Sequence, residues 1–116
     1  MRVAGLASGP VYSATLNVMV ERIWTTEIDR HVGERVSILG WHVTSKLVHD
    51  KNERLMEFIG FEDTTAIYDA TFFADAYERF CHLLATNRPF LLTGRVEEDF
   101  GVCSLRVEKL ERLPWP

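Results

Sequence analysis

Between residues 55 and 73 the chain alternates apolar and polar positions, in the stretch LMEFIGFEDTTAIYDATFF. A period of two predicts β-strands, and the polar run at 62–65 predicts the turn that joins two of them. Phe58, Gly60 and Asp69 fall on one face of this hairpin, which is left for solvent or a ligand. The other face closes a core and carries Ile59, Phe61, Tyr68, Ala70 and Phe72.

The same kind of alternation predicts three further strands. A first strand begins at Glu34 and runs to Val43, with a bend at Gly40. A fourth strand covers residues 89–98 with Gly94 at its middle, and a fifth covers 102–113 after a turn at 98–101. Residues 45–54, SKLVHDKNER, are polar and predict a loop between the first strand and the hairpin.

A helix is predicted between the third and fourth strands, at residues 74–86. Asp75 and Glu78 stand in its first turn, where carboxylates interact favourably with the helix dipole. Its apolar stripe can plug the end of a barrel and consists of Ala76, Tyr77, Phe80, Cys81 and Leu84.

The predicted order is therefore three strands, a helix and two strands within about 80 residues. A short, strand-rich domain with glycines at its bends closes most easily into a small barrel. The five-stranded Greek-key barrel with one helix between strands three and four is the OB-fold, so the fold class is mainly β. The alternative is an open α+β sheet with the helix on one face.

The first 32 residues are predicted to be an appendage to an OB-fold domain at 33–113, with a short tail at 114–116. Residues 1–14 contain Gly, Ser and Pro and are typical of a linker or a cut end. A helical stripe follows, although residues 18–20 suit a strand equally well. Thr25 or Thr26 can cap a short helix that ends at Gly33. The stripe consists of Leu16, Met19, Val20, Ile23 and Trp24.

Composition narrows the function classes. The 116 residues carry a formal net charge of −4, which argues against strong non-specific binding of nucleic acid but leaves room for a local basic patch. The two cysteines, Cys81 and Cys103, lie in apolar patterns and are predicted to be buried free thiols. No segment suits a signal peptide or a membrane span, so we expect a cytoplasmic protein without a membrane partner.

The residues that usually carry catalysis are not arranged for it. The four histidines do not pair with the cysteines at metal-ligand spacing, and no phosphate-cradling loop or nucleophile elbow occurs. Asp63, Asp69 and Asp75 are spaced for turn and cap positions. We therefore expect no metal, no cofactor and no catalysis by this chain itself.

Three stretches resemble the OB-fold module near the C-terminus of bacterial DNA polymerase III alpha subunits. They are VSILGWHVTSK, LMEFIGFEDTTAIYDATFFADAYERFCHLL and FLLTGRVEED, and the resemblance covers roughly residues 33–112. It implies a non-catalytic module that holds single-stranded DNA in DNA replication. Such a module is either the C-terminal fragment of one of these DNA-directed DNA polymerases or a stand-alone relative. The chain lacks that family's polymerase carboxylates and phosphoesterase-like histidines, so it cannot polymerise DNA.

A more distant resemblance connects Gly40, Trp41 and residues 58–63 to the anticodon-binding OB domain of class II aminoacyl-tRNA synthetases. It implies that Phe58 stacks on a base and that Lys46 is the nearest equivalent of a basic residue that contacts nucleic acid. An OB-fold holds single strands by stacking bases on aromatic side chains and by pairing phosphates with basic ones. The candidate binding residues are Phe58, Gly60, Lys46, Lys51, Arg54, His49 and Arg106.

Several alternatives stay open at this point. A one-residue shift of the strand would bury Phe58, and the basic residues at 45–54 suit a solvated loop as well as a phosphate site. The acidic run at 97–99 would repel phosphates, so binding should be weak and salt-sensitive. Two other functions are also open. The N-terminal stripe suggests a protein-interaction module that docks onto replisome subunits or onto the rest of a parent chain. The more distant resemblance suggests a tRNA anticodon-binding domain.

Overall fold

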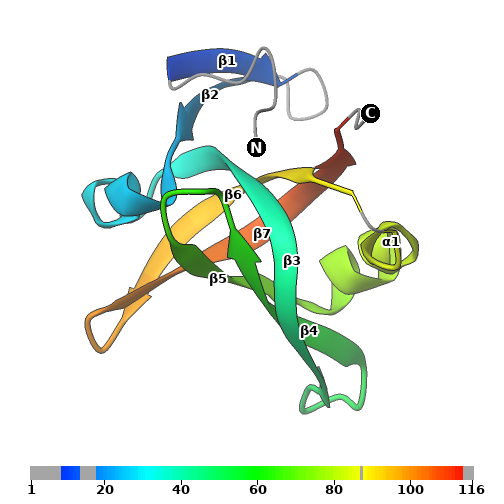
Figure 1. Ribbon diagram of the computed structural model, residues 1–116. Helices are drawn as coiled ribbons and strands as arrows, with labels where there is room; N and C mark the ends of the chain where they lie inside the picture. The colour runs from blue at the N-terminus through cyan, green and yellow to red at the C-terminus, as the bar shows by residue number, and fades with distance from the viewer. Residues whose placement is uncertain (1–8, 14–17, 87, 114–116) are drawn as a thin grey trace.

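Five strands close into a barrel in the computed structural model, which describes residues 9–13, 18–86 and 88–113. They are β3 (Arg35–His49), β4 (Leu55–Glu62), β5 (Ile67–Phe72), β6 (Phe90–Asp99) and β7 (Val102–Arg112) (Figure 1). The pairing order is β3-β4-β5-β7-β6, and β6 returns to β3 to complete the barrel. Helix α1 (Ala74–Leu84) lies between β5 and β6 in the chain. The predicted OB-fold is confirmed, and the β3–β6 pairing excludes the open sheet.

Strand β3 changes partners at Gly40, the predicted bend. Its first half pairs with β6 as far as Gly40, and its second half pairs with β4 from Trp41 onward. A Cβ atom on Gly40 would lie 2.6 Å from the hydroxyl oxygen of Tyr68 and 2.9 Å from Cβ of Phe61. The close packing of β3 on β4 and β5 therefore leaves room only for glycine at this position.

The core is centred on Phe61. Its ring lies 5.9 Å from Tyr68, 6.4 Å from Phe72 and 6.3 Å from Phe90, measured between ring centroids. The predicted core face of the β4–β5 hairpin is confirmed, because all five of its residues are at most 4% exposed. Alternating strand geometry thus buries one face of the hairpin and leaves the other outside.

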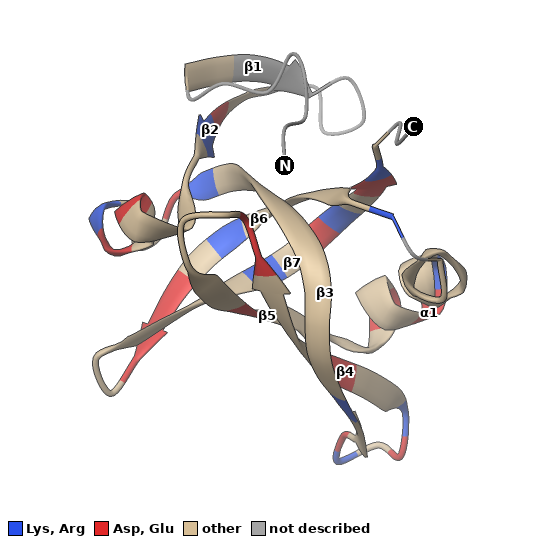
Figure 2. Ribbon diagram, viewed as in Figure 1, with Lys and Arg blue, Asp and Glu red and all other residues tan. Residues whose placement is uncertain are grey.

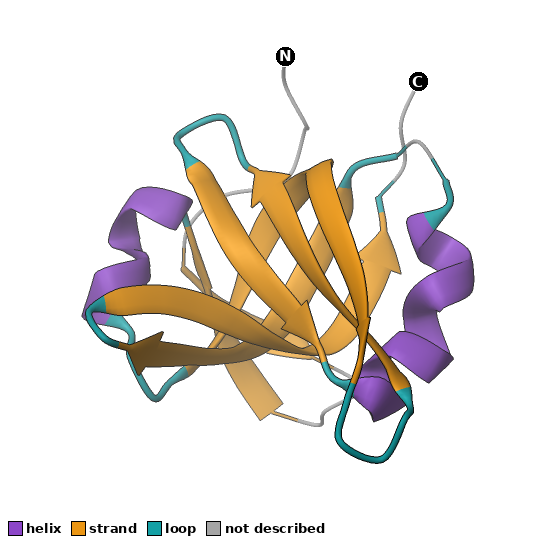
Figure 3. Ribbon diagram, turned by 90° about the horizontal axis from the view of Figure 1, so that it is seen from below, coloured by secondary structure: helices purple, strands orange, loops and turns teal. Residues whose placement is uncertain are grey.

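Helix α1 packs against one side of the barrel, and the short helix η1 (Thr25–Arg30) lies on the opposite side (Figure 3). The stripe of α1 that packs on the core contains Ala76, Tyr77, Phe80, Leu83 and Leu84. Cys81 and Cys103 are free thiols, but each is half-buried rather than buried as predicted. Each sits at the rim of the packed region, near its solvent boundary.

The N-terminal segment differs from its prediction. Residues in the expected helical stripe form a strand instead, β2 (Val18–Ile23), which pairs in parallel with the first half of β3. Residues 9–13, expected in a linker, form β1 and pair with β2. The open edge of β3 opposite β6 supplies hydrogen-bonding partners, and this tertiary pairing overrides the helical spacing. Leu16 and the predicted tail at 114–116 lie outside the described residues.

The first half of the predicted loop at 45–54 is strand. Residues 45–49 continue β3 and pair with β4 up to His49 opposite Leu55, so the connection is confined to residues 50–54. Asp50 closes this connection by accepting hydrogen bonds from the backbone of Asn52 and Arg54, at 2.8 and 2.9 Å. We call residues 45–49 and the residues of β4 that pair with them the arm. Because residues 45–47 and 49 are exposed, this part of β3 can be polar, and its polarity suggested a loop.

Tyr68 gives the fold a testable response to pH. Burial raises the pKa of its hydroxyl well above the usual 10, and the nearby Asp63 carboxylate raises that pKa further. Because the folded pKa is raised, the stabilisation is complete below pH 10 and is lost as the pH rises above it.

We expect the free energy of unfolding to fall above pH 10, by up to about 1.4 kcal/mol per pH unit for this one group. Tyr68→Phe should lose roughly 1 kcal/mol at pH 7, because the hydroxyl donates a 3.1 Å bond to the Leu39 carbonyl, but should fall less steeply in alkali. Urea titrations at pH 8 to 11 measure both curves. Equal alkaline slopes would contradict this role of Tyr68.

Candidate nucleic-acid interface

The outer face of the barrel carries a row of side chains that crosses all five strands. Pairing puts Lys46 of β3 opposite Phe58 of β4, and Phe58 opposite Thr71 of β5. Thr71 is in register with Arg106 of β7, which is opposite Arg95 of β6. We call Lys46, Phe58, Thr71, Arg106 and Arg95 the cross-strand row. The row brings one aromatic ring between basic side chains.

Phe58 points outward, as predicted, and its side chain is 45% exposed. The register that would have buried it is thereby excluded. Its neighbours Lys46 and Arg106 are also exposed. Lys46 makes no ion pair with another described residue, whereas Arg106 lies 3.7 Å from a Glu97 carboxylate oxygen.

A shallow hollow of about 430 Å³ lies beside Phe58. It is lined by Lys46, Phe58 and Thr71 of the row and by neighbouring residues that include Thr44, Gly60, Asp69 and Ser104. Gly60 forms part of its floor, and a Cβ atom there would lie 3.0 Å from the Thr44 hydroxyl oxygen. The missing side chain lets a planar group approach the backbone beside Phe58.

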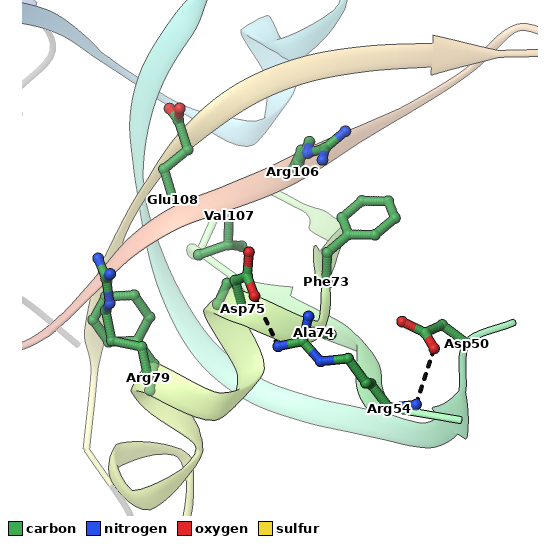
Figure 4. Close-up of a pocket in the computed structure, with 11 residues that line it drawn as sticks. Asp50, Arg54, Phe73, Ala74, Asp75, Arg79, Arg106, Val107 and Glu108 are labelled. Atoms are coloured by element: carbon green, nitrogen blue, oxygen red, sulfur yellow. Dashed lines mark hydrogen bonds and ion pairs between the residues drawn. The ribbon is translucent and has the colours of Figure 1, made fainter. Parts of the chain in front are cut away.

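A second hollow, of about 360 Å³, lies where β7, α1 and the β3–β4 turn meet. The Phe73 ring lies beside the Arg106 guanidinium (Figure 4), whose central carbon is 4.3 Å from the ring centroid. This distance is typical of a cation–π contact. Arg106 therefore belongs to the cross-strand row and also lines the second hollow.

Arg54 enters the second hollow from the β3–β4 turn and is held there by carboxylates (Figure 4). One guanidinium nitrogen donates to Asp75 at 2.7 Å and to Glu78 at 3.0 Å. These hydrogen bonds, that of Asp75 first, raise the pKa of Arg54. Its charge is paired at the surface with two exposed carboxylates, and a phosphate would have to compete with both of them.

The other predicted residues lie further from Phe58. Lys51 is exposed in the β3–β4 turn. His49 pairs with Leu55 at the end of β3, and strand alternation puts its side chain on the face opposite that of Lys46. The structure thus brings Phe58, Gly60 and Lys46 together at one hollow, with Arg106 further along the row beyond Thr71. Lys51, Arg54 and His49 belong to the arm and its turn.

The sequence interpretation did not include Phe73 or Arg95. Phe73 follows β5 directly and precedes α1, and the sequence interpretation took it only as the last residue of the hairpin at 55–73. Extending the alternation of Asp69 and Thr71 by two residues would have put Phe73 on the outer face. Arg95 joins the row only through the pairing of β6 with β7, which spacing alone does not give.

Comparisons with known proteins place this fold in context. The chain matches no family model. An error-prone DNA polymerase from Symbiobacterium thermophilum is 33% identical over 86 residues, which are 72% of this chain and 8% of the polymerase. The chain thus spans about 8% of the length of the curated relative that it matches.

Two solved structures share the architecture. A domain of replication protein A from Methanococcus maripaludis has a TM-score of 0.63 at 12% identity, covering 79% of this chain and 94% of that one. An OBody bound to hen egg-white lysozyme has a TM-score of 0.60 at 18% identity, covering 81% and 92%. The sequence resemblance to a bacterial DNA polymerase is confirmed, and this chain is an OB-fold domain similar to a short segment of such a polymerase.

Proposed function

We propose that this chain is a non-catalytic module that binds single-stranded DNA across the outer face of β4 and β5. The observation that carries the proposal is the exposed ring of Phe58 between two basic side chains, Lys46 and Arg106. OB-folds use this face for oligonucleotides. The similarity to a DNA polymerase segment supports a role in DNA replication.

Phe58 supplies a stacking platform, since every base has a face that can lie on an aromatic ring. Gly60 lets the base or sugar approach closely in the adjoining hollow. Lys46 and Arg106, on either side, pair with successive phosphates, and Arg95 extends the basic line onto β6. The Phe73 ring beside Arg106 offers a second platform.

Two features keep the proposed binding weak and salt-sensitive. Asp69 and Glu97 lie on the same face and repel phosphates, and Arg54 is already paired with Asp75 and Glu78. Lys51 and His49 lie on the arm, so they would contact DNA only if the bound strand bent around the β3–β4 turn. Contacts of this kind depend on counterion release and fall with added salt.

The larger assembly is also a proposal. We propose that the module acts within a DNA polymerase III alpha subunit, whose DNA-directed DNA polymerase activity would reside elsewhere in the longer chain. The 33% identity to an error-prone DNA polymerase supports this assignment, as does the small fraction of that polymerase which the similarity covers.

Phe58→Ala is expected to weaken binding of a fluorescent oligo-dT by about 1–3 kcal/mol, or roughly 5- to 150-fold, because the stacked base loses its platform. Lys46→Glu should weaken binding and reduce the slope of log K against log salt by at least about 0.7, the value for one phosphate contact. Fluorescence anisotropy at low salt measures the change in affinity, and the same titration at a series of salt concentrations measures the slope.

Arg30→Glu on η1 is the matched control, since it makes the same kind of charge change on another side of the barrel. It should leave the salt slope nearly unchanged. The absence of binding at high micromolar protein, or equal binding by wild type, Phe58→Ala and Lys46→Glu, would refute the proposal. Tighter binding of a tRNA anticodon arm than of oligo-dT would favour the anticodon-binding alternative.

A protein-interaction role is the second candidate, but the N-terminal stripe now supports it less. Val20 and Ile23 are buried on the chain's own fold, and of the stripe's described residues only Met19 is largely exposed. An exposed apolar surface at the turn between β6 and β7 supports this role better.

A further inference from the structure

The connection between β6 and β7 ends in an exposed aromatic side chain. Phe100 and Gly101 form a two-residue turn with φ values of 51° and 80°, and the Phe100 side chain is 99% exposed. Positive φ at both positions is typical of a type I′ turn, where Asn-Gly or Gly-Gly is favoured. A bulky aromatic residue is disfavoured there, so neither the local backbone nor the core accounts for Phe100.

A further apolar side chain adjoins the turn. Val102, the next residue after Gly101, is 60% exposed at the start of β7. We call Phe100 and Val102 the apolar tip. Two adjoining large apolar side chains that are exposed in this way are a candidate interaction surface.

The strand leading into the apolar tip is acidic. Glu97, Glu98 and Asp99 end β6, and this end of the strand is red up to the turn in Figure 2. Glu97 is near Arg106, whereas the ion pairs among the described residues include neither Glu98 nor Asp99. Burial raises the pKa of the neighbouring Cys103 thiol, and the carboxylates of Glu98 and Asp29 raise it further, so η1 adds to the negative charge here.

The negative charge beside the apolar tip determines which class of partner can bind there. A phosphate backbone would meet uncompensated carboxylates, and an anionic lipid surface would meet the same repulsion. A protein surface with basic residues around an apolar pocket has the complementary charge. A single aromatic side chain buried at the centre of such a contact commonly supplies much of its energy.

We propose that the apolar tip docks into an apolar pocket rimmed by lysine or arginine on a protein partner, with Phe100 inserted and Glu98 and Asp99 paired to the rim. This surface is distinct from the cross-strand row, so the proposal stands independently of DNA binding. It gives the protein-interaction role a defined location and a partner of defined chemistry.

The test uses the whole chain and three short synthetic peptides that alternate lysine with leucine, glutamate with leucine, or lysine with serine. Amide shifts in NMR titrations report where each peptide binds. We expect the lysine–leucine peptide to shift resonances of residues 97–103 saturably, and the other two to leave them unchanged. Phe100→Asn should weaken this binding at least tenfold, and because Asn-Gly suits the turn, the variant keeps the hairpin.

Val43→Asn removes another exposed apolar side chain, on β3, and is the matched control that should bind as wild type does. The double change Glu98→Lys and Asp99→Lys should shift preference to the glutamate–leucine peptide. Equal responses to the lysine–leucine and glutamate–leucine peptides, or no effect of Phe100→Asn, would overturn the proposal. So would oligo-dT binding at residues 97–103 that Phe100→Asn abolishes, because Phe100 would then be a base platform.

Discussion

Gly94→Ala is expected to destabilise the barrel by about 3 kcal/mol, the upper end for forcing extra volume into a packed site. A Cβ atom on Gly94 would lie 2.1 Å from the carbonyl oxygen of Arg106 and 2.8 Å from its carbonyl carbon. Both atoms belong to the backbone of β7, which cannot turn aside as a flexible side chain can. The strands would have to separate, and urea unfolding would show a lower midpoint.

The reason for this close approach is an irregularity in the β6–β7 pairing. Thr93 pairs with Lys109 but Gly94 pairs with Val107, so Glu108 has no opposite residue. The Glu108 side chain instead accepts two hydrogen bonds from the Arg35 guanidinium, at 2.7 and 3.0 Å. A bulge of this kind bends the strand and brings the partner backbone inward.

Gly60→Ala is the matched control for Gly94→Ala. Its Cβ atom would meet the Thr44 hydroxyl at 3.0 Å, and that hydroxyl is the end of a side chain that can rotate. The smaller entropy of alanine in the unfolded chain also offsets any crowding. We expect a change within about 1 kcal/mol. Equal midpoints for the two variants would show that the close approach at Gly94 does not limit stability.

Asp63→Ala is expected to lower the free energy of unfolding by about 3 kcal/mol, because one buried and three part-buried hydrogen bonds lose a charged acceptor. Asp63 is fully buried in the β4–β5 turn. Its carboxylate accepts bonds from the Thr65 amide at 2.9 Å, the Thr65 hydroxyl at 2.6 Å and the Ala66 amide at 3.2 Å. It also accepts a 2.5 Å bond from the amide of Thr25, which begins η1.

The bond to Thr25 predicts which backbone amide loses protection from hydrogen exchange first in Asp63→Ala. Hydrogen exchange at the Thr25 amide should accelerate in Asp63→Ala more than exchange at core amides of β3. Asp50→Ala is the matched control, since Asp50 also accepts backbone bonds in a turn but does so at the surface. It should cost no more than about 1 kcal/mol. If the two variants lose equal stability, the buried bond to η1 contributes nothing.

The hairpin at 55–73 was predictable because its alternation is strict and one face is uniformly apolar. The outward direction of Phe58 agrees with that pattern, but a shift of one residue would have buried it, and the pairing of β4 with β3 and β5 decides between the two registers. Asp63 was correctly assigned to a turn, but its bond to Thr25 joins residues 38 positions apart and leaves no trace in local spacing. The same limit applies to Arg95, which reaches Arg106 only through pairing between strands.

The N-terminal strand shows a different limit. The predicted helical stripe contains residues 18–20, which suit a strand equally well. Pairing of β2 with the free edge of β3 stabilises the strand. Residues 45–49 were polar enough to suggest a loop, yet they pair regularly with β4, and all of them except Val48 are exposed, so they can be polar and still form a strand. In both cases the deciding partner lay elsewhere in the chain.

The double use of β3 also constrains the order in which the chain can become compact. Ser37 is in register with Arg22 on one edge and with Thr93 on the other, where the two buried hydroxyl groups lie 2.7 Å apart. During synthesis from the N-terminus, β2 can cover one edge of β3 early. The other edge has no partner until β6 is synthesised, about fifty residues later. Until then its backbone groups are exposed and can pair with a wrong strand. Closure of the barrel is therefore a late, non-local event.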